Sequence, residues 1–214
     1  MSPTRKVLVV DDHPIFRKGL IRLLASEPGM QVVAEASDRY QALAALGTER
    51  PDVVLLDLTL GDDSGLELIK DILAQAPRAR VLVLSMHDPR YYAERARAAG
   101  ALGYCRKEEA VEHLIDAVRT VAAGQHWTSP TAPDPETVPG RSDTEDRVRT
   151  LSDREFQIFT LLGTGLETAE IAQMFHLSAK TVDTHKSNLK AKMGCQSSRE
   201  IRQLAIEWQT YQGR

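Results

Sequence analysis

Short apolar runs recur along the first 123 residues, and amphipathic segments separate them. The runs begin at five positions: Val7, Val32, Val53, Val81 and Leu102. They are continuous rather than alternating, which is typical of strands buried on both faces of a parallel sheet. Each interval of 21 to 28 residues leaves room for one helix and two loops. The pattern predicts an α/β domain over residues 1–123, a doubly wound five-stranded parallel sheet covered by helices.

The pattern changes after residue 123. Residues 124–149 include TSPTAPDPETVPGRSDTEDR, which has four prolines and no apolar periodicity. Such a composition favours a flexible linker. Residues 150–214 carry only helical patterns, so we expect a second, all-α domain there.

Helix signals divide this second domain. Ser152 and Glu155 have the spacing of a capping box, and Ser178 and Gly194 bracket a longer helix. A shorter helix over residues 168–175 precedes that helix across a tight turn. Two helices joined in this way, with one more on each side, predict a small helix-turn-helix domain.

Composition and charge narrow the class of protein. Hydrophobic residues are 42% of the chain, but no apolar run approaches the roughly 20 residues that a membrane span needs. Only two cysteines occur, Cys105 and Cys195, which argues against a disulfide framework. We therefore expect a cytoplasmic protein with no membrane partner. Residues 148–214 carry 9 basic and 7 acidic residues, a weak indication of an anionic partner.

Carboxylates follow two of the predicted strands. Asp11 and Asp12 end the first strand and Asp57 ends the third, and these strands are expected to be neighbours. Any one of these aspartates could instead cap a helix. Three carboxylates at one edge repel one another unless a cation lies among them, and such hard oxygen ligands suit Mg²⁺. Ser85 ends the fourth strand and Lys107 follows the fifth. A hydroxyl, an ammonium and a divalent cation around a carboxylate could hold a phosphoryl group while the carboxylate attacks it.

Four segments carry these residues: VLVVDDHPIFRKGL, PDVVLLDLTLGDDSG, VLVLSMHDPRYY and GALGYCRK. Together they resemble the receiver domain of NarL/FixJ-type response regulators, over residues 5–123. The resemblance implies that Asp57 accepts a phosphoryl group from a cognate sensor histidine kinase. It also implies a Mg²⁺ site formed by Asp12, Asp57 and the backbone carbonyl of Thr59, with Asp11 acting partly through water.

The same resemblance gives roles to three residues further along the chain. Ser85 would hydrogen-bond one phosphoryl oxygen, and Lys107 would pair with another. Tyr104 matches the aromatic residue that moves inward with Ser85 and relays the signal. One position departs from the family, because Gly61 stands where a proline is usual, and this should loosen the loop after Asp57.

The segment SAKTVDTHKSNLKAKM, residues 178–193, carries four lysines and one aspartate. Lysines can contact phosphates and short polar side chains can reach base edges, as a helix in the major groove requires. A charge run on a helix is also often only a solvated face. Val182, Leu189 and Met193 are predicted to face the core.

Residues 151–208 resemble the LuxR-type helix-turn-helix in the segments LSDRE, GLETAEIA and LSAKTVDTHKSNLKAKMG. The resemblance implies base contacts from Asp183, Thr184 and Ser187. It implies phosphate contacts from Lys180, Thr181, His185, Lys186 and Lys190. Glu167-Thr168 stands where the family commonly has Ser-Asn, which puts a phosphate contact there in doubt. Because a carboxylate weakens DNA binding unless it accepts from cytosine, Asp183 is expected to discriminate between sites more than it strengthens binding.

These observations favour a two-component response regulator rather than an enzyme. Its only chemistry would be self-phosphorylation from a phosphodonor and self-dephosphorylation. The expected partners are double-stranded DNA, the kinase and a second copy of the chain when phosphorylated, and RNA polymerase is a further candidate. An aspartyl-phosphate hydrolase usually has an acidic residue soon after its nucleophile, whereas Leu58 and Thr59 follow Asp57. A switch whose helical domain binds protein would leave the lysines of residues 178–193 without a role.

Overall fold

The computed structural model describes residues 4–60, 63–86, 89–130, 143–175 and 177–212. The chain divides into two compact units, residues 1–133 and 134–214. Within the described residues, no helix combines the length and the apolar character that crossing a membrane requires.

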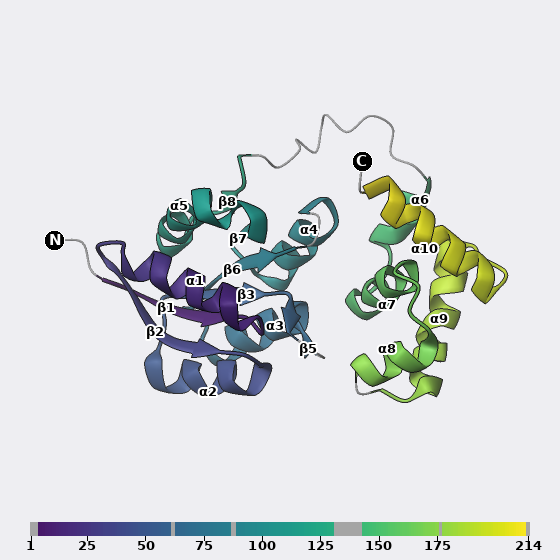
Figure 1. The fold of residues 1–214 in the computed structure, drawn as a ribbon, viewed down its shortest axis with the longest axis horizontal. Coiled ribbons are helices and arrows are strands. Elements are labelled where there is room, and N and C mark those ends of the chain that lie inside the picture. Colours follow the sequence, from purple (N-terminus) through teal and green to yellow (C-terminus); the bar gives the residue numbers. More distant parts are fainter. Residues whose placement is uncertain (1–3, 61–62, 87–88, 131–142, 176, 213–214) are drawn as a thin grey trace. The chain divides into compact units, whose positions relative to one another are not determined.

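The first unit is built on a parallel sheet (Figure 1). Its strands are β1 (Arg5–Val10), β2 (Met30–Ala36), β3 (Val53–Asp57), β6 (Arg80–Ser85), β7 (Gly103–Arg106) and β8 (Trp127–Thr128). They lie in the order β2-β1-β3-β6-β7-β8. A separate antiparallel pair, β4 (Thr59–Leu60) and β5 (Asp63–Ser64), follows β3. The doubly wound fold predicted from the apolar runs is confirmed.

Helices cover both faces of this sheet. They are α1 (Pro14–Ala25), α2 (Arg39–Glu49), α3 (Gly65–Gln75), α4 (Pro89–Ala99) and α5 (Ala110–Ala122), with a 3₁₀ turn, η1 (Lys107–Glu109), before α5. Val7, Val9 and Leu55 pack with α1 and α5 in one apolar cluster. The alternate residues Leu8 and Leu56 are fully buried on the opposite face. Burial on both faces explains why the strand sequences are continuous apolar runs.

The sheet has one strand more than the sequence predicted. Trp127 pairs with Gly103 in parallel register, and its amide donates to Leu102 O at 2.9 Å. Gly103 leaves room beside the Trp127 Cβ, so the indole is buried against the sheet edge. The predicted linker covers residues 124–149, and its residues 127 and 128 therefore belong to the first unit. Two residues are too few for strand periodicity to be visible in the sequence.

The second unit is all-helical. It consists of α6 (Asp143–Arg149), α7 (Asp153–Gly163), α8 (Thr168–Met174), α9 (Ala179–Met193) and α10 (Ser198–Gln212). The capping box of Ser152 and Glu155 is present, and Ser178 caps α9. Gly194 ends α9 at φ 70°, a left-handed conformation that favours glycine.

Helix α6 lies within residues 124–149, the predicted linker, so a folded element extends into that segment from its C-terminal side. Arg147 donates to Met193 O at 2.7 Å, and Val148 is 1% exposed. The helix therefore satisfies a carbonyl at the C-terminus of α9 and buries one apolar side chain. One apolar residue gives no periodic pattern, so the sequence did not reveal this helix.

Candidate functional site

The three predicted carboxylates meet at the carboxyl ends of β1 and β3. The two strands are neighbours, with Val10 paired to Leu56, so Asp11 and Asp57 emerge side by side. Asp11 is 1% exposed and Asp57 is 2% exposed. Asp12 is half-buried beside them. The parallel register thus brings together residues 46 positions apart, as the sequence predicted.

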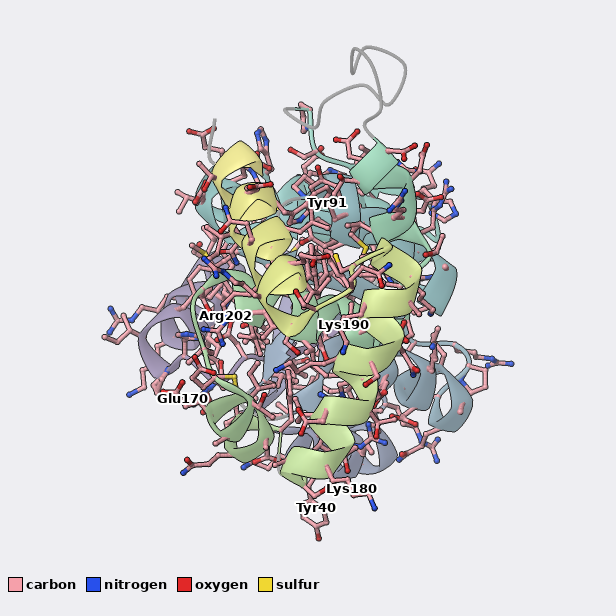
Figure 2. The ribbon with its side chains drawn as sticks, turned by 90° about the vertical axis from the view of Figure 1, so that its right-hand side faces the viewer. Tyr40, Tyr91, Glu170, Lys180, Lys190 and Arg202 are labelled. Atoms are coloured by element: carbon pink, nitrogen blue, oxygen red, sulfur yellow. The ribbon has the colours of Figure 1, made fainter. Side chains whose placement is uncertain are left out.

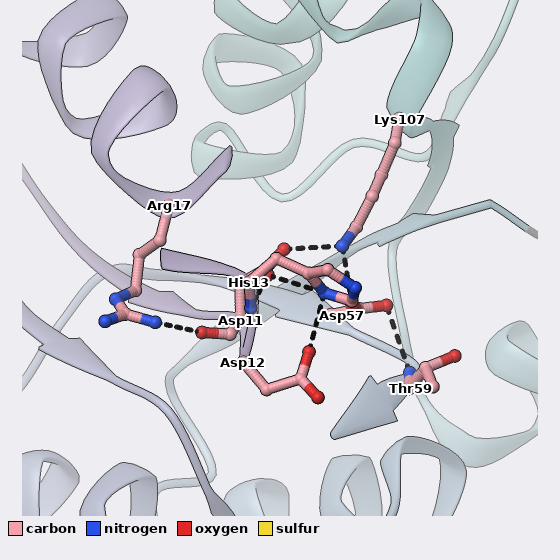
Figure 3. A network of polar contacts seen from close by, with 7 residues as sticks. All are labelled: Asp11, Asp12, His13, Arg17, Asp57, Thr59 and Lys107. Atoms are coloured by element: carbon pink, nitrogen blue, oxygen red, sulfur yellow. Dashed lines mark hydrogen bonds and ion pairs between the residues drawn. The ribbon is translucent and has the colours of Figure 1, made fainter. Parts of the chain in front are cut away.

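Lys107 lies between two of these carboxylates (Figure 3). Its Nζ is 2.6 Å from Asp57 Oδ2 and 2.7 Å from Asp11 Oδ2. The same ammonium lies 4.7 Å from the centre of the Phe16 ring, a cation–π contact. The lysine is 7% exposed and begins η1, so a short turn after β7 fixes where its side chain starts.

Burial governs the electrostatics of this cluster. It raises the pKa of the Asp57 carboxyl from 3.8 to about 6, against the lowering effect of Lys107 and of the Thr59 amide. Burial alone would lower the pKa of Lys107, but Asp57 and Asp11 raise it above its ordinary value. The ammonium is therefore held in its charged form, while the carboxylates remain incompletely neutralised.

His13, which was not predicted as a site residue, also lies in this cluster. It is the N-cap residue of α1, and its amide donates to Asp11 Oδ1 at 2.7 Å. Its ring also enters the cluster, with Nδ1 2.7 Å from Asp12 Oδ1 and 3.8 Å from Asp57 Oδ2 (Figure 3). The sequence feature that could have indicated a site role for His13 is its position directly after two aspartates at a strand end. Its ring direction depends on the backbone turn into α1.

The cluster has the donors that a divalent cation needs. Asp11, Asp12, His13 and Asp57 each offer one ligand atom, and these atoms lie within 4.8 Å of one another. Carboxylate oxygens suit Mg²⁺, whereas imidazole is a weaker match for it. The excess of carboxylates over ammonium and the buried position of two of them fit the binding of a cation.

The loop after Asp57 is held close to the site. The Thr59 amide donates to Asp57 Oδ1 at 3.0 Å, which orients the carboxylate. Gly65 begins α3 against this segment, and a Cβ there would lie 2.4 Å from Leu58 Cα. Only glycine fits such a close backbone approach. Gly61, predicted to loosen this loop, lies outside the described residues.

Two further predicted residues lie on the neighbouring strands. Ser85 ends β6 and is fully buried, one residue beyond Leu84, the partner of Asp57. Tyr104 lies in β7, paired with Val83, and is 6% exposed. Both side chains are therefore near the same edge of the sheet as Asp57. Their roles stay predictions.

In the second unit, α9 presents a polar face (Figure 2). Lys180, Asp183, Thr184 and Ser187 are exposed, and Thr181, His185, Lys186 and Lys190 are half-buried. Val182, Leu189 and Met193 are buried, as predicted. The helix thus has a polar side that bears all the predicted DNA contacts and an apolar side packed on the domain core.

Several polar side chains of α9 already have partners within the domain. The hydroxyls of Thr184 and Ser187 donate to the carbonyls of Lys180 and Asp183, at 3.0 and 2.9 Å. Each hydroxyl oxygen still has lone pairs that can accept. Lys192 has a structural role instead, since its Nζ is 2.6 Å from Oε2 of the buried Glu155. The net charge of the helix therefore overstates the charge available to a ligand.

Comparison with known proteins identifies both units. Residues 7–119 match the family of response regulator receiver domains, and residues 149–205 match the bacterial regulatory proteins of the luxR family. The chain is 35% identical over 204 residues to the DNA-binding transcriptional activator DevR/DosR of Mycobacterium tuberculosis, covering 94% of each chain. It is 38% identical over 196 residues to the transcriptional regulatory protein UhpA of Salmonella typhimurium, covering 91% of this chain and 94% of that protein.

Solved structures agree. A LuxR-family two-component response regulator from Aurantimonas sp. SI85-9A1 is 37% identical, with a TM-score of 0.57, and covers 61% of this chain and 91% of its own. The response regulator ChrA of a heme-sensing two-component system is 30% identical, with a TM-score of 0.53. The match covers 98% of this chain and 99% of ChrA. The chain therefore belongs to the LuxR-type (NarL/FixJ-type) response regulators, two-component transcription regulators that join a receiver domain to a DNA-binding helix-turn-helix domain.

Proposed function

We propose that Asp57 is the phosphoacceptor of this response regulator and that a sensor histidine kinase supplies the phosphoryl group. The observation that carries this assignment is the position of Lys107, whose ammonium lies 2.6 Å from the Asp57 carboxylate. A carboxylate oxygen of Asp57 would attack phosphorus while the bond to the kinase histidine breaks. The positive charge of Lys107 would then pair with a phosphoryl oxygen.

Mg²⁺ is the cation that we propose for the site. Asp12 and Asp57 would hold it together with the Thr59 carbonyl, and Asp11 would act partly through water. When bound, the ion neutralises the phosphoryl oxygens and so lowers the cost of bringing them to a carboxylate. The buried Asp11 and Asp57 carboxylates support this assignment, because two such charges share one ammonium.

Ser85 and Tyr104 would transmit the modification. Ser85 is buried at the end of β6, where its hydroxyl would be drawn to a phosphoryl oxygen. Tyr104, on the adjacent β7, would then move inward and change the surface formed with α4 and α5. The close placement of the two residues on paired strands supports this route.

The output would be sequence-specific binding of double-stranded DNA by α9. Thr184, Ser187 and Asp183 are exposed on its polar face, as base contacts require. Helix-turn-helix proteins commonly bind two half-sites as dimers. The RcsB response regulator, similar in fold to this chain, has been solved bound to DNA and as dimers on DNA. We therefore propose a homodimer when phosphorylated, acting on DNA in the bacterial cytoplasm, with RNA polymerase as a further partner.

We also propose that the receiver, linker and DNA-binding domain occupy about residues 1–123, 124–149 and 150–214, with β8 and α6 extending the two folded units into the linker. The only chemistry that we assign is self-phosphorylation and self-dephosphorylation at Asp57. A hydrolase acting on other substrates is disfavoured because Leu58, directly after Asp57, is buried and apolar. That residue cannot serve as a general acid.

Mapping of the acyl phosphate tests the assignment. The full chain is incubated with acetyl phosphate and Mg²⁺, and the labelled peptide is identified by mass spectrometry. We expect label on Asp57, its loss in Asp57→Ala, and its loss when Mg²⁺ is chelated. Asp116→Ala, which changes an exposed aspartate of α5, is the matched control and should label normally. Undiminished labelling of Asp57→Ala would refute the proposal.

A further inference from the structure

An ion pair joins the start of α8 to α10. Glu167 is the N-cap residue of α8, and its Oε1 lies 2.7 Å from a guanidinium nitrogen of Arg202. The other guanidinium nitrogen donates to Leu166 O at 3.2 Å. The hydrogen bond and charge of Arg202 lower the pKa of Glu167, so the carboxylate is ionised at neutral pH. The pair therefore holds an ionised carboxylate against the Arg202 guanidinium at this point of the surface.

A lysine from α9 reaches the same place. Lys186 donates from Nζ to the Thr168 hydroxyl at 2.7 Å, one residue after Glu167. Lys186 also contributes to lowering the pKa of Glu167, as a smaller effect than Arg202. Arg202 of α10 thus pairs directly with Glu167, and Lys186 of α9 ends one residue away on Thr168. A second carboxylate is adjacent, because Glu170 Oε2 accepts from the Glu167 amide at 2.8 Å (Figure 2 labels Arg202 and Glu170).

Stability alone does not account for this carboxylate. The Glu167 side chain is 65% exposed, and exposed ion pairs contribute little to folding. It occupies the N-cap position of α8, where its amide donates to Glu170, and serine or asparagine is a better N-cap residue. A charged residue at this position therefore has its main effect on what approaches from solvent.

A DNA phosphate that approaches Lys186 would meet this carboxylate. The phosphate would be repelled by Glu167, and it would have to compete with Glu167 for Arg202. Log affinity for DNA falls as log salt concentration rises, and each phosphate contact that a cation makes steepens this fall by about 0.9. A cation already paired with a carboxylate contributes less to that slope.

We propose that Glu167 limits the sequence-independent affinity of this protein for DNA by competing with DNA phosphates for Arg202 and Lys186. The proposal rests on the proposed function of α9 as the DNA-reading helix. It assigns Arg202 a role as a phosphate contact that becomes available when Glu167 is removed. With its phosphate contacts weakened, the protein would depend more on the base contacts of α9 to recognise DNA.

The test measures salt-dependent binding of the full chain. Fluorescence anisotropy with a mixed-sequence duplex, over about 50 to 200 mM salt, gives the affinity and its slope. We expect Glu167→Gln and Glu167→Ser to bind about 10-fold more tightly at low salt, with slopes steeper by about 1 to 2. Serine keeps the helix cap, so agreement between the two variants excludes a folding effect.

Glu207→Gln is the matched control. It removes the same charge from an exposed position on α10, where the side chain accepts from Gln203. We expect less than a two-fold change and an unaltered slope. Adding Arg202→Gln to Glu167→Gln should remove about half of the gain in slope.

Three outcomes would overturn the inference. They are Glu167 variants that behave like Glu207→Gln, Glu167 variants that bind more weakly than wild type, and a double variant that keeps the full gain. Absence of wild-type binding at every salt concentration would instead refute the proposed DNA-binding function, and the inference with it.

Discussion

Asp57→Asn should stabilise the receiver at neutral and alkaline pH. Asp57 is 2% exposed and shares the Lys107 ammonium with Asp11. Asparagine has almost the same shape as the protonated acid and, like it, offers one acceptor oxygen. That oxygen can replace Oδ1, which accepts from the Thr59 amide, or Oδ2, which faces Lys107, but not both. The substitution therefore removes a buried negative charge and leaves the Lys107–Asp11 ion pair in place.

The magnitude follows from the pKa of Asp57, which burial raises from 3.8 to about 6 against the opposing effect of Lys107. At about 1.36 kcal/mol per pH unit, that difference is about 3 kcal/mol of unfolding free energy. The folded protein holds the proton more tightly, so the unfolding free energy falls as pH rises between these two values. Below 3.8 the carboxyl is neutral in both states, and asparagine should bring little gain. Above about 6 the gain should approach its full size.

Hydrogen-exchange mass spectrometry at increasing urea concentration, read on peptides from β1 and β3, measures the stability of the receiver. The comparison is made at pH 5 and pH 8 without divalent cations, with Asp116→Asn as the control. Adding Mg²⁺ should stabilise wild type more than Asp57→Asn, because the variant has lost one proposed ligand. Equal stability of wild type and variant at pH 8, or a larger gain at pH 5, would refute this electrostatic account.

Three further predictions concern lysines of the two domains. Lys107→Ala should still be phosphorylated, but phosphorylation should no longer increase its affinity for DNA, as mobility-shift titration with acetyl phosphate would show. Lys192→Met should destabilise the helical domain by about 1–3 kcal/mol in urea unfolding, because the buried Glu155 loses its cation; wild-type stability would contradict this. Lys186→Ala should reduce the steepness of the salt dependence on any sequence, by less than the value of about 0.9 for a full phosphate contact, because Glu167 competes for this lysine. Thr184→Ala should mainly blur sequence preference, and competition assays distinguish the two.

The sheet and its carboxylates could be predicted because they depend on strong, repeated signals. Runs such as those beginning at Val53 and Val81 are long enough to show burial on both faces. Once the strand order is doubly wound, Asp11 and Asp57 must emerge at one edge. The caps at Ser152 and Ser178 were equally visible, since a cap is a local pattern of a few residues.

The contacts that the sequence did not reveal join residues distant in the chain through side-chain directions. Glu109 accepts from Arg106 at 2.9 Å and from Ser129 at 2.6 Å. This buried network links η1 to the residue just after β8. Arg202 and Glu167 are 35 positions apart on different helices. No periodicity or spacing rule carries such pairings, which depend on how two packed elements face each other.

Both domains hold a cation against a carboxylate at the place where a phosphate is expected. At Asp57 two buried carboxylates share one ammonium, so the site keeps an excess of negative charge. Because the groups are buried, salt in the solvent screens them little. At Glu167 the pair with Arg202 is largely exposed, and salt screens the interaction. Ionic strength should therefore change DNA affinity strongly while it changes phosphorylation of the receiver much less. The difference arises from burial, because both sites pair carboxylates with cationic side chains.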